Sequence, residues 1–82
     1  MNVEIISPES ILYKGEAMLV KVPGTAGSFE ILPNHSPIVS TLSEGEIKIK
    51  ETNQSVKTFK ITGGAIEFSS NNVSIAVHSL LK

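Results

Sequence analysis

The chain contains no cysteine, arginine, aspartate or tryptophan among its 82 residues. The lack of cysteine excludes both a disulfide framework and a thiolate metal site, and it fits a cytosolic or cytosol-facing setting better than a secreted one. Without aspartate, the two histidines His35 and His78 cannot easily join a catalytic triad, and two imidazoles are too few for a multi-histidine metal site. We therefore expect no catalytic residue, no cofactor and no metal site.

Charge and long apolar runs are also limited. The seven basic residues are all lysine and the eight acidic residues are all glutamate, so the formal net charge is -1. A nucleic-acid-binding protein usually carries a basic patch with arginine for phosphate or guanine contacts. No apolar run approaches the roughly 20 residues that a membrane-spanning helix needs. Neither nucleic-acid binding nor direct membrane insertion is therefore expected.

The first half of the chain lacks any window long enough for a helix, because proline or glycine interrupts it repeatedly up to Pro37. Later segments alternate apolar and polar residues with period two, which is typical of half-buried strands. Ile47 and Ile49 form one such face, and Phe59 and Ile61 form the next. The polar residues 52–55 between them predict a hairpin turn.

Short strands of this kind recur along the whole chain, with separate strands expected around residues 11–13 and 18–22. This rhythm predicts a single all-β domain over residues 1–82, a flattened sandwich or barrel of about eight to ten short strands in two sheets. We also expect the domain to be a monomer in isolation. The chain has room for one core. The predicted core residues are Val20, Val22, Phe29, Ile31, Ile49, Phe59, Ile61, Ile66, Phe68, Ile75 and Val77.

The densest local signal is the segment PGTAGSFEILPNHSPIVS, residues 23–40. Pro33 and Pro37 each fix their own φ and bias the preceding residue toward extended geometry, so the polar residues 34–36 between them should form a stiff loop. A stiff loop loses little entropy when it binds a partner. His35 could serve as a general base or a metal ligand, but a loop histidine bonded to nearby backbone or to a partner is the simpler reading. Gly24, Gly27, Gly63 and Gly64 read as turn glycines because no phosphate-binding motif follows them.

Three segments of the chain carry a family resemblance: VPGTAGSFEILPNHSPIVSTLSEGEIKI, FKITGGAIEF and NVSIAVH. Their order and spacing resemble the amino-terminal β-sandwich domain of the epsilon subunit of the bacterial F-type ATP synthase. The resemblance implies a ten-stranded sandwich and a non-catalytic place in the central stalk, where the domain docks on the gamma subunit and the c-subunit ring and passes proton-driven rotation to the catalytic head. It also implies a peripheral location on the cytoplasmic face of the bacterial inner membrane, within the F1 sector.

The resemblance further implies a set of partner-binding residues. Those on or near the gamma side are Ser7, His35, Ser40 and Thr62. Two loops match the ends of the domain that face the c ring and the base of gamma, and their residues are Gly24, Thr25, Ala26, Gly27, Ser28, Pro33, Asn34, His35, Ser36 and Pro37.

The chain departs from the family pattern at two places. Glu30 stands where the family commonly has glycine, and the sequence stops at Lys82, before the carboxy-terminal helical hairpin that the family usually carries. We expect either a naturally short member or an excised domain. One alternative function is a stand-alone β-sandwich module that binds a small ligand or peptide through the His35 loop. Another is a small hydrolase or metal enzyme, which the lack of aspartate, arginine and cysteine disfavours.

Overall fold

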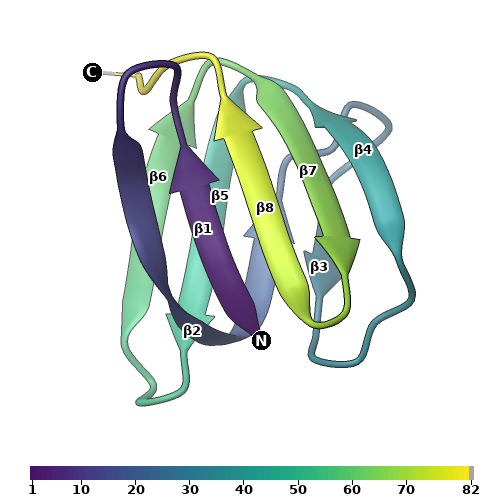
Figure 1. Cartoon of the computed structure of the whole chain (residues 1–82). Coiled ribbons are helices and arrows are strands. Elements are labelled where there is room, and N and C mark those ends of the chain that lie inside the picture. Colours follow the sequence, from purple (N-terminus) through teal and green to yellow (C-terminus); the bar gives the residue numbers. More distant parts are fainter. Residues whose placement is uncertain (82) are drawn as a thin grey trace.

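The computed structural model describes residues 1–81, and these form an all-β structure without a helix (Figure 1). Its strands are β1 (Asn2–Ile6), β2 (Ile11–Val22), β3 (Phe29–Ile31), β4 (Ile38–Leu42), β5 (Gly45–Glu51), β6 (Val56–Ile61), β7 (Gly64–Ser69) and β8 (Asn72–Val77). The described residues include no helix of the length and apolar character that crossing a membrane requires. The predicted fold class is confirmed.

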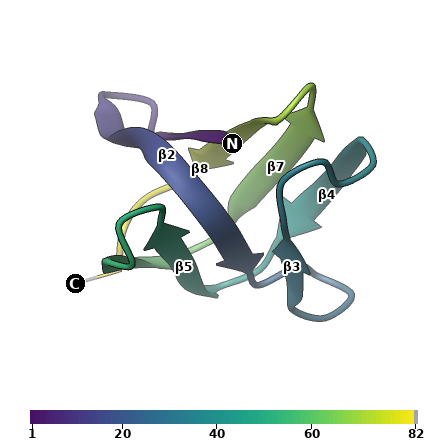
Figure 2. The same cartoon turned by 90° about the horizontal axis from the view of Figure 1, so that it is seen from below.

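The strands follow one hydrogen-bonded path that curls into two layers. Its order is β4-β7-β8-β1-β2-β5-β6, with β3 paired to β2 beside this path. The β1–β8 pair is parallel and the other pairs are antiparallel. Figure 2 shows β2 crossing from the layer that holds β7 and β8 to the layer that holds β3 and β5. Below, the first sheet means the layer of β4, β7, β8, β1 and the first part of β2, and the second sheet means the layer of β3, β5, β6 and the last part of β2.

Strand β2 explains why the described residues form eight strands, the lower end of the expected range. The two strands expected within residues 11–22 are one continuous strand, whose first part pairs with β1 and whose last part pairs with β5. A register shift between Ala17 and Leu19 accompanies the change of partner. A Cβ at Gly15 would lie 2.7 Å from the Tyr13 hydroxyl oxygen, so a larger residue there would displace the end of the Tyr13 side chain.

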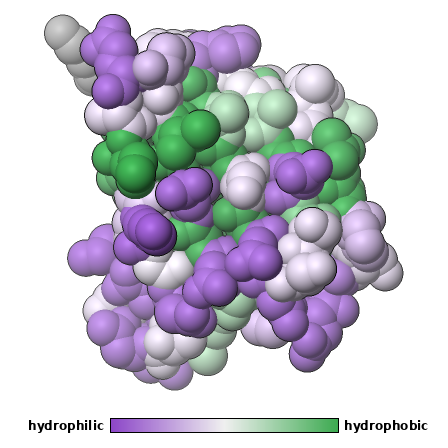
Figure 3. All heavy atoms as spheres, in the orientation of Figure 1, coloured by the Kyte–Doolittle hydropathy of each residue, from purple (hydrophilic) through white to green (hydrophobic). Residues whose placement is uncertain are grey.

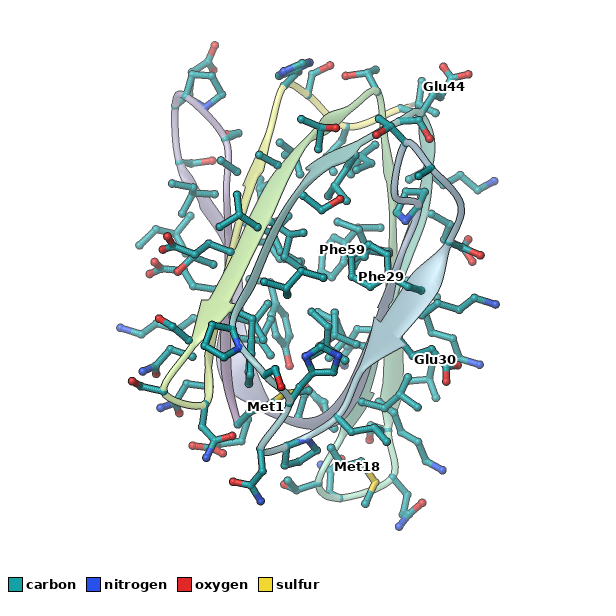
Figure 4. All side chains as sticks on the ribbon, turned by 90° about the vertical axis from the view of Figure 1, so that its right-hand side faces the viewer. Met1, Met18, Phe29, Glu30, Glu44 and Phe59 are labelled. Carbon is teal, nitrogen blue, oxygen red and sulfur yellow. The ribbon has the colours of Figure 1, made fainter. Side chains whose placement is uncertain are left out.

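The core fills the space between the two sheets. The predicted core residues are fully buried except Phe29 and Phe59, which are half-buried. Their register partners, Val22 and Ile47, are buried, so both rings lie on inward faces, as Figure 4 shows. Phe68 is the aromatic residue that is fully enclosed. The core also contains Val3, Ile5, Ala17, Leu42, Ile47 and Val73.

Candidate functional site

The residues predicted to bind partners lie at two opposite ends of the sandwich and on the strand between them. Ser7, Thr62 and the turn 24–28 lie at the end where β1 and β8 finish, the upper end in Figure 1. The loop 33–37 lies at the other end, beside the β7–β8 turn. Ser40 lies on β4, which connects the two ends. The structure therefore does not bring the two predicted loops together.

The turn 24–28 is anchored to β4. The Thr25 amide N–H donates to the Thr41 carbonyl oxygen over 3.1 Å, and the two threonine hydroxyls lie 2.8 Å apart. Gly24 is buried, and a Cβ there would lie 2.7 Å from the Phe29 ring. Gly27 has φ 130, a conformation that favours glycine. The turn is thus fixed by backbone pairing, while Thr25, Ala26 and Ser28 are exposed.

The hydroxyls of Ser7 and Thr62 are engaged within the chain. Ser7 Oγ accepts hydrogen bonds from the backbone N–H groups of Glu9 at 3.4 Å and Ser10 at 3.3 Å, which closes the β1–β2 loop. Thr62 Oγ1 donates to the Ser79 carbonyl oxygen over 3.3 Å, and the Thr62 amide donates to the same oxygen. Both residues therefore shape the loops of this end rather than offering free polar groups.

The loop 33–37 is held by Asn71, a residue that sequence reasoning did not connect with it. The Asn34 amide N–H donates to Asn71 Oδ1 over 2.7 Å, and Asn71 Nδ2 donates to Asn34 Oδ1 over 3.0 Å. Both asparagines have positive φ, 67 at Asn34 and 58 at Asn71, and asparagine is among the few residues that tolerate this region. The two hydrogen bonds are called the Asn clasp below. Turn signals at both positions were visible in the sequence, but nothing local could reveal that the two turns meet.

His35 is exposed and bonded to its own loop. Its Nδ1 lies 2.6 Å from the Ser36 carbonyl oxygen, and its ring meets Phe68 edge to face with centroids 6.0 Å apart. His78 lies at the opposite end, where its amide donates to the Gly63 carbonyl oxygen. Within residues 1–81 no group of three or more His, Cys, Asp or Glu is placed to hold a metal ion.

Ser40 lies on the inward side of β4. It pairs with buried Ile66, it is half-buried itself, and its hydroxyl donates to the Thr41 carbonyl oxygen over 3.1 Å. The side chain of this predicted gamma-side residue is therefore directed toward the interior of the sandwich and not out of the sheet. The neighbouring Val39 points outward instead and is 74% exposed.

The outward side of the first sheet carries a row of small and apolar residues. Thr41, Ala65, Ala76 and Ile6 follow one another in register across β4, β7, β8 and β1. A second row beside it consists of Val39, Glu67, Ser74 and Glu4. The two rows are called the apolar face below. Figure 3 shows the apolar atoms as a green band across the upper half of this side.

A shallow hollow deepens the apolar face near the first row. Its lining includes Ile6, Ser7, Ala65 and Ala76. Ser7, one of the predicted gamma-side residues, therefore borders this face directly. No lysine among residues 1–81 belongs to the two rows.

The outward side of the second sheet has the opposite character. Lys21 lies directly opposite Lys48, and Lys60 lies opposite Glu46. The side chains that make up this lysine face are Lys21, Glu30, Glu46, Lys48, Lys50 and Lys60. In Figure 4 the labelled Glu30 projects outward on the side where several side chains end in nitrogen. None of the lysines in the described part of the chain forms an ion pair. An ion pair does join the Met1 amino group to the Glu16 carboxylate over 3.6 Å.

Tyr13 and Glu51 join the two parts of the fold at the bend of β2. The Tyr13 hydroxyl donates a hydrogen bond to Glu51, and the Tyr13 ring packs edge to face on Phe59 with centroids 5.7 Å apart. Burial, together with the hydrogen bond and the negative charge of Glu51, raises the pKa of Tyr13 to about 12. The phenol is thus neutral at physiological pH and its role here is structural.

The chain is similar in sequence to known proteins over its whole length. The profile of the family described as "ATP synthase, Delta/Epsilon chain, beta-sandwich domain" matches residues 1–82. The ATP synthase epsilon chain of Leptospira borgpetersenii serovar Hardjo-bovis (strain JB197) is 48% identical over 83 residues, which cover 100% of this chain and 65% of that relative. The ATP synthase epsilon chain of Rickettsia typhi (strain ATCC VR-144 / Wilmington) is 34% identical over 83 residues, covering 99% of this chain and 76% of that relative. This chain therefore spans about two thirds to three quarters of the length of these relatives.

Two solved assemblies contain chains with the same fold. A chain in the Euglena gracilis mitochondrial ATP synthase structure, described as OSCP/F1/c-ring in rotational state 1, superposes with a TM-score of 0.85 at 14% identity, covering 96% of this chain and 51% of that chain. A chain in the central stalk/c-ring structure of Tetrahymena thermophila mitochondrial ATP synthase gives a TM-score of 0.79 at 21% identity, covering 100% and 66%. At these identities the likeness establishes the fold. Together with the profile match, it shows that this chain belongs to the ATP synthase delta/epsilon chain β-sandwich family, as the sequence resemblance predicted.

Proposed function

We propose that this β-sandwich is a central-stalk domain of a bacterial F-type ATP synthase, which docks on the gamma subunit and the c ring and couples proton-driven rotation to ATP synthesis. It performs no chemistry itself. In this role it lies on the cytoplasmic side of the inner membrane and meets the membrane only through other subunits. The family membership and the stalk assemblies that contain the same fold support this proposal.

The observation that carries the proposal is the apolar face. Val39 is 74% exposed and Ile6 is 39% exposed. The small residues Ala65 and Ala76 lie in the row of Ile6, whereas Glu67 and Ser74 lie in the row of Val39. Protein interfaces are depleted of lysine at their centres, and an exposed apolar surface of this kind marks a place where another protein docks. We assign the apolar face to gamma, with Ser7 at one margin and the loop 33–37 at the other.

The two predicted loops receive different partners under this proposal. The loop 33–37 leads directly into β4, whose Val39 and Thr41 belong to the apolar face, so we place it against gamma. The turn 24–28 lies at the opposite end of β4, away from the loop 33–37. We assign the turn to the c ring. Its exposed side chains on a fixed backbone suit a contact that must transmit force without yielding.

Neighbouring residues of β4 provide the sharpest test, because one faces out and the next faces in. Val39→Glu should weaken binding to purified gamma by roughly a hundredfold, since it places an unpaired charge in a desolvated contact. Its melting temperature should fall only slightly, because the side chain is exposed and the new carboxylate lies opposite Glu67, a like-charge pair that costs roughly 0.2–1 kcal/mol. Ser40→Glu should instead lower the melting temperature, because the added carboxylate points toward the core beside Ile66.

Gln54→Glu in the β5–β6 turn is the control, since it adds the same charge far from the apolar face. Binding is measured by titration calorimetry with gamma, alongside thermal melts of each variant. If Val39→Glu and Gln54→Glu bind gamma as wild type does, the apolar face is not the gamma contact. If wild type itself fails to bind gamma, the proposed function is wrong.

A further inference from the structure

The loop 33–37 has little regular structure of its own, yet it is fixed at its centre. Its own backbone supplies one hydrogen bond, from the His35 amide to the Leu32 carbonyl oxygen over 3.1 Å. Its side chains add the contact of His35 Nδ1 with the Ser36 carbonyl oxygen at 2.6 Å. From outside the loop, the Asn clasp joins it to the β7–β8 turn, 37 residues away in sequence. The loop thus depends on a side chain that belongs to another hairpin.

The Asn clasp is well matched to holding a loop in one shape. Asn71 accepts from the backbone of Asn34 and donates to its side chain, so a single residue fixes both the path of the loop and the rotamer of Asn34. His35 follows directly, with its ring against Phe68 of the strand that leads into the same turn. A loop that is ordered before binding does not lose that entropy when it meets a partner.

We propose that Asn71 is a positioning residue for partner binding: through the Asn clasp it holds the loop 33–37 in the shape that contacts gamma. This rests on the proposed function. Asn71 itself belongs to the β7–β8 turn and is not assigned a contact with gamma. Its effect on affinity is therefore indirect, through the order of residues 34 and 35.

Asn71→Gly is the variant that tests this. Glycine accepts φ 58 without strain, so the turn and the melting temperature should be preserved while both hydrogen bonds are lost. The first readout is hydrogen exchange of the Asn34 amide, measured by NMR, which should become at least about tenfold faster when its acceptor is removed. The second is binding to gamma, which should weaken by about tenfold as the loop loses its preorganisation.

Two further variants separate positioning from a general effect of glycine. Gln54 has φ 75 and makes no side-chain hydrogen bond within residues 1–81, so Gln54→Gly is a matched control that should leave both readouts unchanged. Asn71→Asp keeps one carboxylate oxygen as acceptor for the backbone N–H of Asn34. If the side-chain amide of Asn34 flips by 180°, its Nδ2 can donate to the second carboxylate oxygen. This variant should restore slow exchange and gamma affinity to within about threefold of wild type.

The outcomes are distinguishable. Unchanged exchange of the Asn34 amide in Asn71→Gly would show that the Asn clasp does not hold the loop. Faster exchange with gamma affinity equal to wild type would show that loop order does not matter for binding, and either result overturns the proposal. If wild type does not bind gamma, the proposed function fails and the positioning role fails with it, while the exchange data still report whether the clasp orders the loop.

Discussion

The two outward faces of this sandwich differ more than the composition of the chain suggests. The apolar face presents Ile6, Ala65, Ala76 and Val39 with two glutamates, while the lysine face presents four lysines and two glutamates. A formal net charge of -1 for the whole chain conceals this separation. Lysine is strongly hydrated and costly to desolvate, so the lysine face is suited to remain in water. The apolar face can be covered at lower cost where Ile6, Ala65 and Ala76 lie, away from its two glutamates.

The contrast continues on the inner sides of the two sheets. Phe68, on β7 of the first sheet, is fully buried, whereas Phe59, on β6 of the second sheet, is half-buried at the edge of the path. The first sheet therefore contributes its aromatic ring to the centre of the core. The second sheet contributes fully buried aliphatic residues such as Ile31 and Ile49, while its aromatic residues Phe29 and Phe59 are only half-buried.

The largest expected effect tests this inner asymmetry. Phe68→Ala should reduce the free energy of unfolding by about 3–5 kcal/mol, because it leaves a cavity at a site with no solvent access. In a domain of this size that approaches the whole stability. Phe59→Ala should cost clearly less, roughly half as much, since part of its ring is already exposed. Urea unfolding of both variants decides the matter, and equal losses would mean that the two sheets contribute alike.

Much of the inner side of the fold could be predicted from the sequence. Period-two alternation placed Ile47, Ile49 and Ile61 on inward faces, and the same pattern identified the β5–β6 hairpin. This works because a strand with one buried face must alternate, whatever its partners are. The continuity of β2 was not predictable in this way, since the chain stays extended while it changes partners at Ala17.

The site was less accessible to sequence reasoning, and for a different reason. The turn 24–28 and the loop 33–37 are close in sequence, but β3 runs between them and carries the chain from one end of the sandwich to the other. The Asn clasp joins residues 37 positions apart, which no local pattern reports. The orientation of Ser40 did have a signal, because Ile38 and Leu42 are each two positions from it and therefore lie on the same side of β4.

A smaller effect concerns the bend where β2 passes from one sheet to the other. The neutral Tyr13 phenol is favoured in the folded chain, where its pKa is about 12, above the ordinary value near 10. Because the folded pKa is raised, this contribution to stability is fully present below about pH 10 and is lost as pH rises toward about 12. The lysines also titrate in this range, so wild type must be compared with Tyr13→Phe.

We expect the melting temperature of wild type to fall more steeply than that of Tyr13→Phe between about pH 10 and 12. The measurement is a series of thermal melts at constant ionic strength. Parallel curves for the two proteins would show that the hydrogen bond between Tyr13 and Glu51 does not link the titration to folding.

The smallest expected effect tests the charge contrast between the faces with one substitution made twice. On the lysine face, Lys48→Glu places a carboxylate opposite Lys21 and between Glu46 and Lys50, which relieves the like-charge cross-strand pair. Cross-strand pairs of this kind contribute roughly 0.2–1 kcal/mol, so the variant should be slightly more stable than wild type. On the first sheet, Lys14 lies opposite Glu4. Lys14→Glu creates a like-charge pair there and should be slightly less stable.

Both variants change the net charge equally, so a difference between them reports local surroundings and not total charge. Thermal melts at low ionic strength should shift in opposite directions for the two variants. The shifts should shrink in about 1 M salt, where the screening length is about 3 Å. Shifts of the same sign would show that these lysines respond to the charge of the whole chain, and the division into two electrostatically distinct faces would then have no energetic meaning.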